Sequence, residues 1–212
     1  MVDLRALPPA PPDADEAPAR ESTSATMALA RAAAAGDERA TQQLLESLTT
    51  RVERVVHVIM GIGHADADDV TQLALIAFTQ ALPAFRGECE PTHYASRIAV
   101  RTALNARRRS RAMRARYDDL ADADIADTMT THDSALAERR KRLVRDLLGV
   151  LPPEQAEALA LRIALGWSLE EIAAASATPL NTIRSRLRLA KEALRRKVES
   201  DPVLREKVEE VK

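Results

Sequence analysis

The stretch "SLEEIAAASATPLNTIRSRLRLAKEALRRKV" (Ser168–Val198) contains a short helical pattern, a turn and a longer helical pattern in direct succession. We expect the turn at Ala177 and Thr178, with Thr178 as the N-cap and Pro179 as the first residue of the second helix. Two helices joined by so tight a turn form a helix-turn-helix, which predicts an all-α domain. Apolar residues at spacings of three and four give the second helix one buried stripe, formed by Leu180, Ile183, Leu187, Ala190 and Leu194.

The face opposite this stripe carries side chains that suit the major groove of DNA. Its residues are Asn181, Arg184, Ser185 and Arg188. Arginine can bind guanine O6 and N7, asparagine suits adenine, and flanking cations can meet phosphate. The segment 180–198 has seven Lys and Arg residues against one acid, Glu192. A solvated basic face would have a similar composition, but the helix-turn-helix frame favours DNA binding by the N-terminal half of the second helix.

The overall composition is that of a helical globular protein. The chain has 212 residues, of which 46% are hydrophobic and 2% aromatic, and a formal net charge of −1. This length allows one or two domains with a real core. Cys89 is the one cysteine, which excludes an intrachain disulfide and fits a reducing compartment. Because we find neither a signal-peptide pattern nor an apolar run of about 18 residues, we expect a cytoplasmic protein without membrane insertion.

A second basic segment lies earlier in the chain and is followed by an acidic one. "RIAVRTALNARRRSRAMRAR" (Arg97–Arg116) has eight arginines and no acid, a density of charge that a polyanion would relieve. Residues 117–138 then have six Asp and one Glu, no Lys or Arg and little apolar periodicity, which predicts an acidic linker. We expect these acids to lie close to the basic helices in the free protein, where they would compete with DNA phosphates.

These patterns divide the chain into five parts. The stripe of Leu44, Leu45, Leu48, Val52, Val55, Val56 and Ile59 and the helical patterns around it predict a bundle of about four helices, which ends in the second basic segment. The fold class is therefore all-α with two helical domains. We expect a disordered leader at 1–25, a first domain at 26–116, the acidic linker at 117–138, a second domain at 139–198, and a tail with a weak helical pattern at 199–212.

The two helical segments together resemble a known family. "LPPEQAEALALRIALGWSLEEIAAASATPLNTIRSRLRLAKEALR" is similar to region 4 of sigma-70 family sigma factors, especially the extracytoplasmic-function (ECF) group. "DADDVTQLALIAFTQALPAFRGE" is similar to their region 2, and "RIAV" begins the helix that reads the promoter −10 element in that family. The resemblance covers about residues 27–198. The family's helix-turn-helix usually holds Gly in its turn, where this chain has Ala177, and Tyr94 stands where a Trp is usual.

The resemblance implies a function and a set of site residues. The protein would bind core RNA polymerase and promoter DNA as an initiation factor, without a cofactor or catalytic site, under the control of an anti-sigma factor that covers both domains. The −35 set would be Asn181, Thr182, Arg184, Ser185, Arg186, Arg188 and Lys191. The −10 set would be Arg97, Arg101, Asn105, Arg107, Arg108, Arg109 and Arg111. The polymerase-docking set would be Asp66, Asp68, Asp69, Val70 and Gln72.

Two other classes of protein fit part of the sequence. A helix-turn-helix regulator acting without being a polymerase subunit would explain residues 166–198 but neither the docking motif nor the first basic helix. An RNA-binding helical protein is disfavoured by the few aromatics available for base stacking. The acids between His64 and Asp69 do not have the Gly and terminal Glu of an EF-hand, and no nucleophile, base and acid arrangement is visible.

Overall fold

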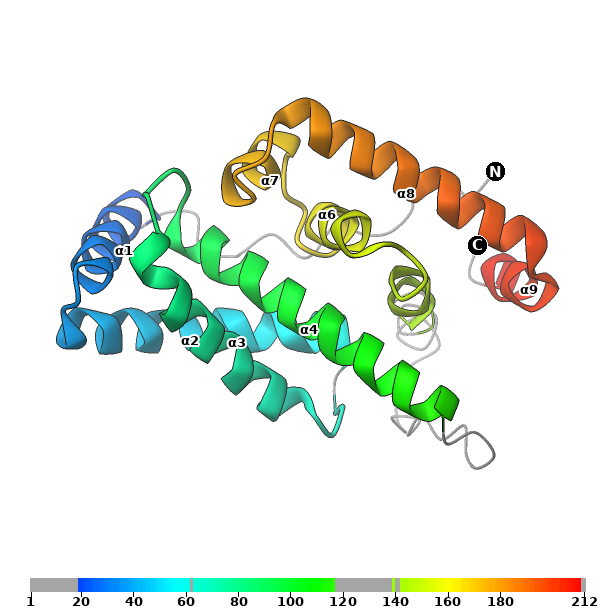
Figure 1. Ribbon diagram of the computed structural model, residues 1–212, viewed down its shortest axis with the longest axis horizontal. Helices are drawn as coiled ribbons and strands as arrows, with labels where there is room; N and C mark the ends of the chain where they lie inside the picture. Colours follow the sequence, from blue (N-terminus) through cyan, green and yellow to red (C-terminus); the bar gives the residue numbers. More distant parts are fainter. Residues whose placement is uncertain (1–18, 62, 117–138, 140–141, 211–212) are drawn as a thin grey trace.

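The computed structural model describes residues 19–61, 63–116, 139 and 142–210, which form helices joined by short connections (Figure 1). The predicted all-α fold is confirmed, because no strand occurs in these described ranges. The helices are α1 (Ala19–Ala34), α2 (Glu38–Met60), α3 (Ala67–Ala81), the short 3-10 helix η2 (Leu82–Ala84), α4 (Pro91–Arg116), a helical segment at 142–148, α6 (Pro153–Ala164), α7 (Leu169–Ala175), α8 (Leu180–Ser200) and α9 (Pro202–Glu210).

Helix α2 is the centre of the first domain and forms around the predicted apolar stripe. Asp37 caps its N-terminus, since Oδ1 accepts a hydrogen bond of 3.0 Å from the backbone N–H of Ala40. Gly61 ends it with φ of 106°. Of the predicted stripe, Leu45 is only partly buried, and the others are within 3% of full burial. These side chains pack against α1, α3 and α4.

Helix α4 packs closely on this core because its buried face is built from small residues. Ala95, Ala99 and Ala103 recur every four residues and are at most 2% exposed, so the α4 backbone can approach its neighbours. On α3, the large ring of Phe78 is fully buried and meets Tyr94 edge-on, with 6.1 Å between ring centroids. The apolar side of α4 thus fixes the helix on the core of the first domain, and the arginines lie on its other sides.

The predicted disordered leader is wrong for residues 19–25, because α1 already begins at Ala19. This helix packs against α2 and η2, and its contact is made by small side chains such as Ala30 and Ala33, which are buried. Residues 19–25 read ARESTSA and contain no apolar residue larger than alanine, so no apolar periodicity marks the start of this helix. Residues 1–18 and the predicted acidic linker at 117–138 lie outside the described residues, and so do the contacts expected of the linker acids.

The second domain contains the predicted helix-turn-helix, formed by α7 and α8. Ile183, Leu187, Ala190 and Leu194 are buried as predicted, whereas Leu180 is only partly buried. The predicted cap is off by one residue: α8 begins at Leu180, and Pro179 rather than Thr178 occupies the N-cap position. The Thr178 hydroxyl instead donates a hydrogen bond of 2.9 Å to the Ser176 carbonyl, inside the turn. The weak helical pattern of the tail is confirmed by α9.

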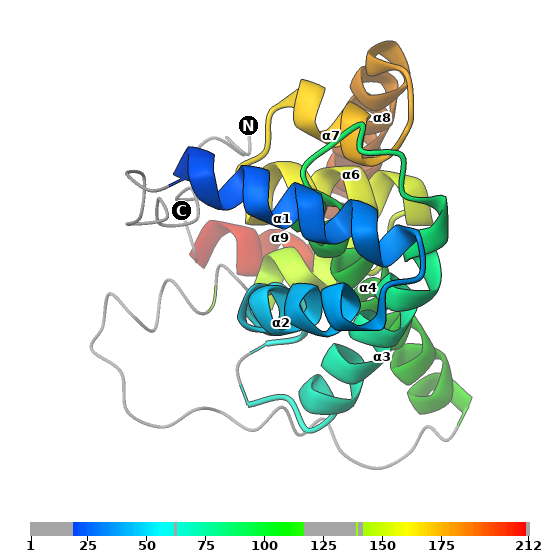
Figure 2. The same cartoon turned by 90° about the vertical axis from the view of Figure 1, so that its left-hand side faces the viewer.

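The two domains pack against each other along α4. Helices α6 and α7 of the second domain contact α4, and the helical segment 142–148 lies next to them. Helix α8 lies on the side of α6 that faces away from α4, and both views show this order (Figures 1 and 2). The two basic helices therefore have different surroundings, since α4 faces the other domain and α8 faces outward.

Candidate nucleic-acid interface

Helix α8 presents the predicted −35 set to solvent. Every member is exposed except Arg186, which is half-buried. Nη1 of Arg184 donates a hydrogen bond of 3.1 Å to Oδ1 of Asn181, and Nη1 of Arg188 lies 2.7 Å from Oε1 of Glu192. Such pairs within one exposed helix are worth only a few tenths of a kcal/mol. The side chains can therefore exchange these partners for bases or phosphates at little cost.

The turn before α8 sets the angle at which this face is presented. Ser168 begins α7 with a capping box: its hydroxyl accepts from the Glu171 N–H at 3.0 Å, and the Glu171 carboxylate accepts from the Ser168 N–H at 2.6 Å. At the other end of α7, Ala177 adopts φ of 46°. A positive φ is needed to reverse the chain here, and this explains why glycine is usual at the position in the family that the sequence resembles.

Helix α4 holds the predicted −10 set, and the structure divides that set in two. Arg101 and Arg109 are exposed, and Asn105 is half-buried. The remaining four arginines contact the second domain or the loop that enters it. These four are Arg97, Arg107, Arg108 and Arg111.

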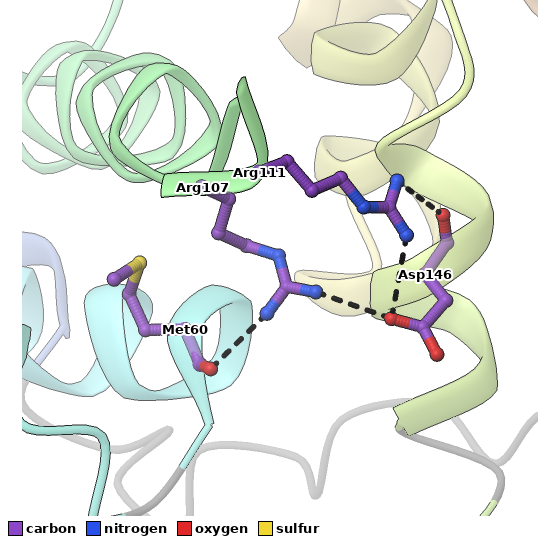
Figure 3. Close-up of polar contacts among 4 residues, drawn as sticks. All are labelled: Met60, Arg107, Arg111 and Asp146. Atoms are coloured by element: carbon purple, nitrogen blue, oxygen red, sulfur yellow. Dashed lines mark hydrogen bonds and ion pairs between the residues drawn. The ribbon is translucent and has the colours of Figure 1, made fainter. Parts of the chain in front are cut away.

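Asp146, in the helical segment 142–148, binds two of these arginines (Figure 3). Its Oδ1 lies 3.4 Å from Nη2 of Arg107 and 3.7 Å from Nη2 of Arg111. Its backbone carbonyl also accepts a hydrogen bond of 3.3 Å from Nη1 of Arg111. Arg107 reaches in the other direction as well, donating at 3.3 Å to the carbonyl of Met60 at the C-terminus of α2, where a cation is favoured.

The other two arginines contact α6 and the turn that precedes it. Nε of Arg97 lies 2.7 Å from Oε1 of Glu157, and both side chains are largely buried, with 22% and 14% exposed. Nη2 of Arg108 donates a hydrogen bond of 3.3 Å to the carbonyl of Leu151, in the turn before α6. No pattern in the sequence identifies Asp146 or Glu157 as partners of α4, because each looks like an ordinary acid on a solvated helix face.

Helix α3 presents most of the predicted docking set. Asp66, Asp68, Asp69 and Gln72 are exposed around its N-terminal half, but Val70 is 3% exposed and belongs to the core. Val70 is therefore corrected from a surface contact to a residue that supports the helix. The same exposed surface carries two apolar residues that sequence reasoning missed, Leu73 and Ile76, which are 49% and 53% exposed. The signal for them is the run "LALIAF", which has too many apolar residues for one buried face.

A ring contact joins the start of α4 to the second domain. The imidazole of His93 lies 4.4 Å from the ring of Trp167, centroid to centroid, and Trp167 is 4% exposed. Burial lowers the pKa of His93, although Glu90 and Glu171 act in the opposite direction. Burial also raises the pKa of the Cys89 thiol, so this cysteine has the character of an unreactive thiol rather than a nucleophile.

Two other features are not found in the described ranges. They contain no group of three or more His, Cys, Asp or Glu side chains placed to hold a metal ion. Among the same residues, no helix combines the length and the apolar character that crossing a bilayer requires.

The comparisons with known proteins match both domains. The family model for Sigma-70 region 2 matches residues 44–113, and that for Sigma-70, region 4 matches residues 141–194. The ECF RNA polymerase sigma-E factor of Escherichia coli (strain K12) is 30% identical over 182 residues, covering 80% of this chain and 91% of that protein. The protein of the same name from Haemophilus influenzae is 29% identical over 172 residues, with 77% and 90% covered.

A solved structure agrees at the level of the fold. The structure of CnrH in complex with the cytosolic domain of CnrY has a TM-score of 0.50 and 22% sequence identity, covering 84% of this chain and 99% of that chain. The helix-turn-helix, the basic helix α4 and the exposed start of α3 thus occur in the order and at the spacing of two sigma-factor regions. This chain belongs to the sigma-70 family of RNA polymerase sigma factors, in its ECF group.

Proposed function

We propose that this chain binds core RNA polymerase through the exposed surface of α3 and directs it to promoters through α8 and α4. In this assignment, α8 enters the −35 major groove with Asn181, Arg184, Ser185 and Arg188, while Arg186 and Lys191 lie near phosphates. On α4, Arg101 and Asn105 read −10 bases and Arg107, Arg108, Arg109 and Arg111 hold the strand. As a sigma factor it is an initiation factor and not an enzyme.

One observation supports this proposal most strongly. The side chains of α8 that suit base edges are exposed on one face of a helix whose opposite face is anchored in the core by Ile183 and Leu187. A recognition helix needs this rigid support because base contacts require fixed positions. Helix α3 also has exposed acids beside the exposed apolar residues Leu73 and Ile76. A regulator that acts without polymerase does not need such a surface.

The partners and the place of action follow from the same proposal. Core polymerase and promoter DNA are the two required partners, and the cytoplasm is where a bacterial sigma factor meets both. An anti-sigma factor is the proposed regulator, as the family resemblance implies. The match to CnrH, whose solved structure holds the cytosolic domain of CnrY, supports a search for such a partner.

Reconstituted transcription tests the proposal directly. The purified chain, mixed with core polymerase and a fragmented genomic template, should produce transcripts with a shared −35 and −10 sequence upstream of their start points. The matched control replaces both Asn181 and Arg184 by Ala, which leaves α3 intact, and it should still bind the polymerase but lose those transcripts. If no transcript depends on the added chain, the proposal is rejected.

A further inference from the structure

We infer that the free protein holds itself in a closed state, in which the second domain occupies four arginines of the predicted −10 set on α4 and leaves α8 open. The masking contacts are defined as the ion pairs Arg97–Glu157, Arg107–Asp146 and Arg111–Asp146 and the hydrogen bond from Arg108 to the Leu151 carbonyl. The inference rests on the proposed function for the identity of the masked ligand, which is −10 DNA.

The masking contacts compete with DNA because they use the same atoms. The guanidinium nitrogens of these arginines would donate to phosphate or base oxygens, and in the closed state they donate to protein oxygens instead. The Arg97–Glu157 pair is the tightest of these, at 2.7 Å and with little exposure of either side chain. A nucleic acid strand cannot reach Arg97 until Glu157, and with it α6, has moved away.

Asp146 acts as a second anchor at the other end of α4. It accepts from Arg107 and Arg111, which lie four residues apart and therefore on one face of the helix (Figure 3). The guanidinium of Arg111 lies against Gly149 of the second domain, where an added Cβ would displace it. The occupied arginines are thus four of the seven residues of the predicted −10 set, whereas Arg101 and Arg109 stay exposed and Asn105 is half-buried.

The recognition helix α8 is not masked in the same way. Its base-reading residues Asn181, Arg184 and Ser185 are exposed, and α6 separates it from α4 (Figure 1). The closed state is therefore asymmetric, because it leaves the −35 surface free while it occupies four arginines of the −10 set. A partner that binds only the open form would shift the population by its difference in affinity for the two states.

The strength of the contacts suits a reversible closure. Arg107 and Arg111 share one half-exposed carboxylate at 3.4 and 3.7 Å, and such partly exposed pairs are weak and screened by salt. Removing the charges of Asp146 and Glu157 should therefore open the molecule without unfolding either domain, since neither acid belongs to the hydrophobic core.

The test compares two double variants. The first combines Asp146→Asn and Glu157→Gln, and the second is a control that removes the same amount of charge. The control is Glu154→Gln with Glu170→Gln, two exposed acids of α6 and α7 without an ion pair to the described part of α4. Small-angle X-ray scattering of the full chain at low salt gives the radius of gyration. Filter binding of a single-stranded DNA oligonucleotide gives the affinity, and circular dichroism checks that the helices are retained.

The double variant should have a larger radius of gyration than wild type and bind the oligonucleotide about three- to tenfold more tightly than the control variant. The difference should disappear as salt rises. The single variant Glu157→Gln should shift both quantities in the same direction by a smaller amount. If the radius of gyration is the same in wild type and both interface variants, or if the double variant gains no more affinity than its control, masking is wrong.

Transcription separates this inference from the proposed function. If the interface variants open and gain single-stranded affinity but no form of the chain supports initiation by core polymerase, the proposed function fails while the masking of a nucleic-acid-binding helix stands. If wild type initiates normally and the variants neither open nor gain affinity, the masking fails while the proposed function stands.

Discussion

Ala177 adopts the left-handed backbone conformation, with φ of 46°, in the turn between α7 and α8. For a residue with a Cβ this conformation costs about 1–2 kcal/mol, which glycine avoids. Glycine also lowers the free energy of unfolding by roughly 0.4–1 kcal/mol, because it makes the unfolded chain more flexible, and this offsets part of the gain. Ala177→Gly should therefore raise the free energy of unfolding by about 0.5–1 kcal/mol in a urea titration.

Ala174 supplies the matched control for this prediction. It is exposed on α7, three residues earlier, and has an ordinary helical backbone. Ala174→Gly should lower the free energy of unfolding by about 0.5–1 kcal/mol, since glycine weakens a helix interior. A loss of stability in both variants would show that the turn is not strained.

The exposed cations of α8 should differ in what they recognise. Arg184→Ala should remove about 1–3 kcal/mol of discrimination at one −35 position, because a bidentate contact to a base is lost. Lys191→Ala should weaken binding to every sequence and lower the salt slope by about one, as expected for a phosphate contact. Binding to a set of duplexes with single base changes, measured at several salt concentrations, distinguishes these results. Equal, sequence-blind losses would remove Arg184 from base reading.

His93 should make stability depend on pH. Its folded-state pKa lies below the ordinary value of about 6.5, mainly because it is buried against Trp167, and Arg51 adds to the effect. The unfolded state therefore takes up the proton first as the pH falls, so the stabilisation is complete above about pH 6.5 and declines below it. His93→Gln should lose this component. Urea titrations of both proteins between pH 5 and 7.5 should show a steeper decline for wild type, and parallel profiles would contradict the prediction.

Helix α3 packs against α2 and α4 and keeps an exposed surface on its other side. Asp69 is exposed in its first turn, beside the exposed apolar pair Leu73 and Ile76. Asp69→Lys should abolish co-purification with core polymerase, while costing the helix only about 0.3–1 kcal/mol through its dipole. The matched control is Glu53→Lys on the exposed side of α2, which should leave co-purification intact. Retained binding by the Asp69 variant would move the docking surface elsewhere.

The helices that sequence reasoning could predict are those with large apolar residues at regular spacing. Helices α2 and α8 are of this kind, and their buried stripes match the prediction almost residue for residue. The start of α1 was missed because residues 19–25 contain no apolar side chain larger than alanine. The cap of α8 was misplaced because Pro179 fits both the N-cap and the first turn. Periodicity also placed Val70 on a helix without telling its face, and only the packing of α3 shows that it is buried.

At the scale of the whole molecule, the arrangement of the two domains was beyond sequence reasoning. The sequence predicted that an acidic linker would offset the basic helices. Within the described ranges, two acids of the second domain, Asp146 and Glu157, pair with α4. These acids are separated from their arginines by 35 or more positions, and a local pattern carries no information on which distant helix an exposed acid will meet.

The ring contact between His93 and Trp167 also gives the protein its own optical probe. Trp167 is the one tryptophan of the chain, and it lies in the contact between α4 and the second domain with 4% of its surface exposed. The emission of an indole moves to longer wavelength as water reaches it. Each separation of the domains in the isolated protein should thus be visible as a shift in its intrinsic fluorescence, without a label.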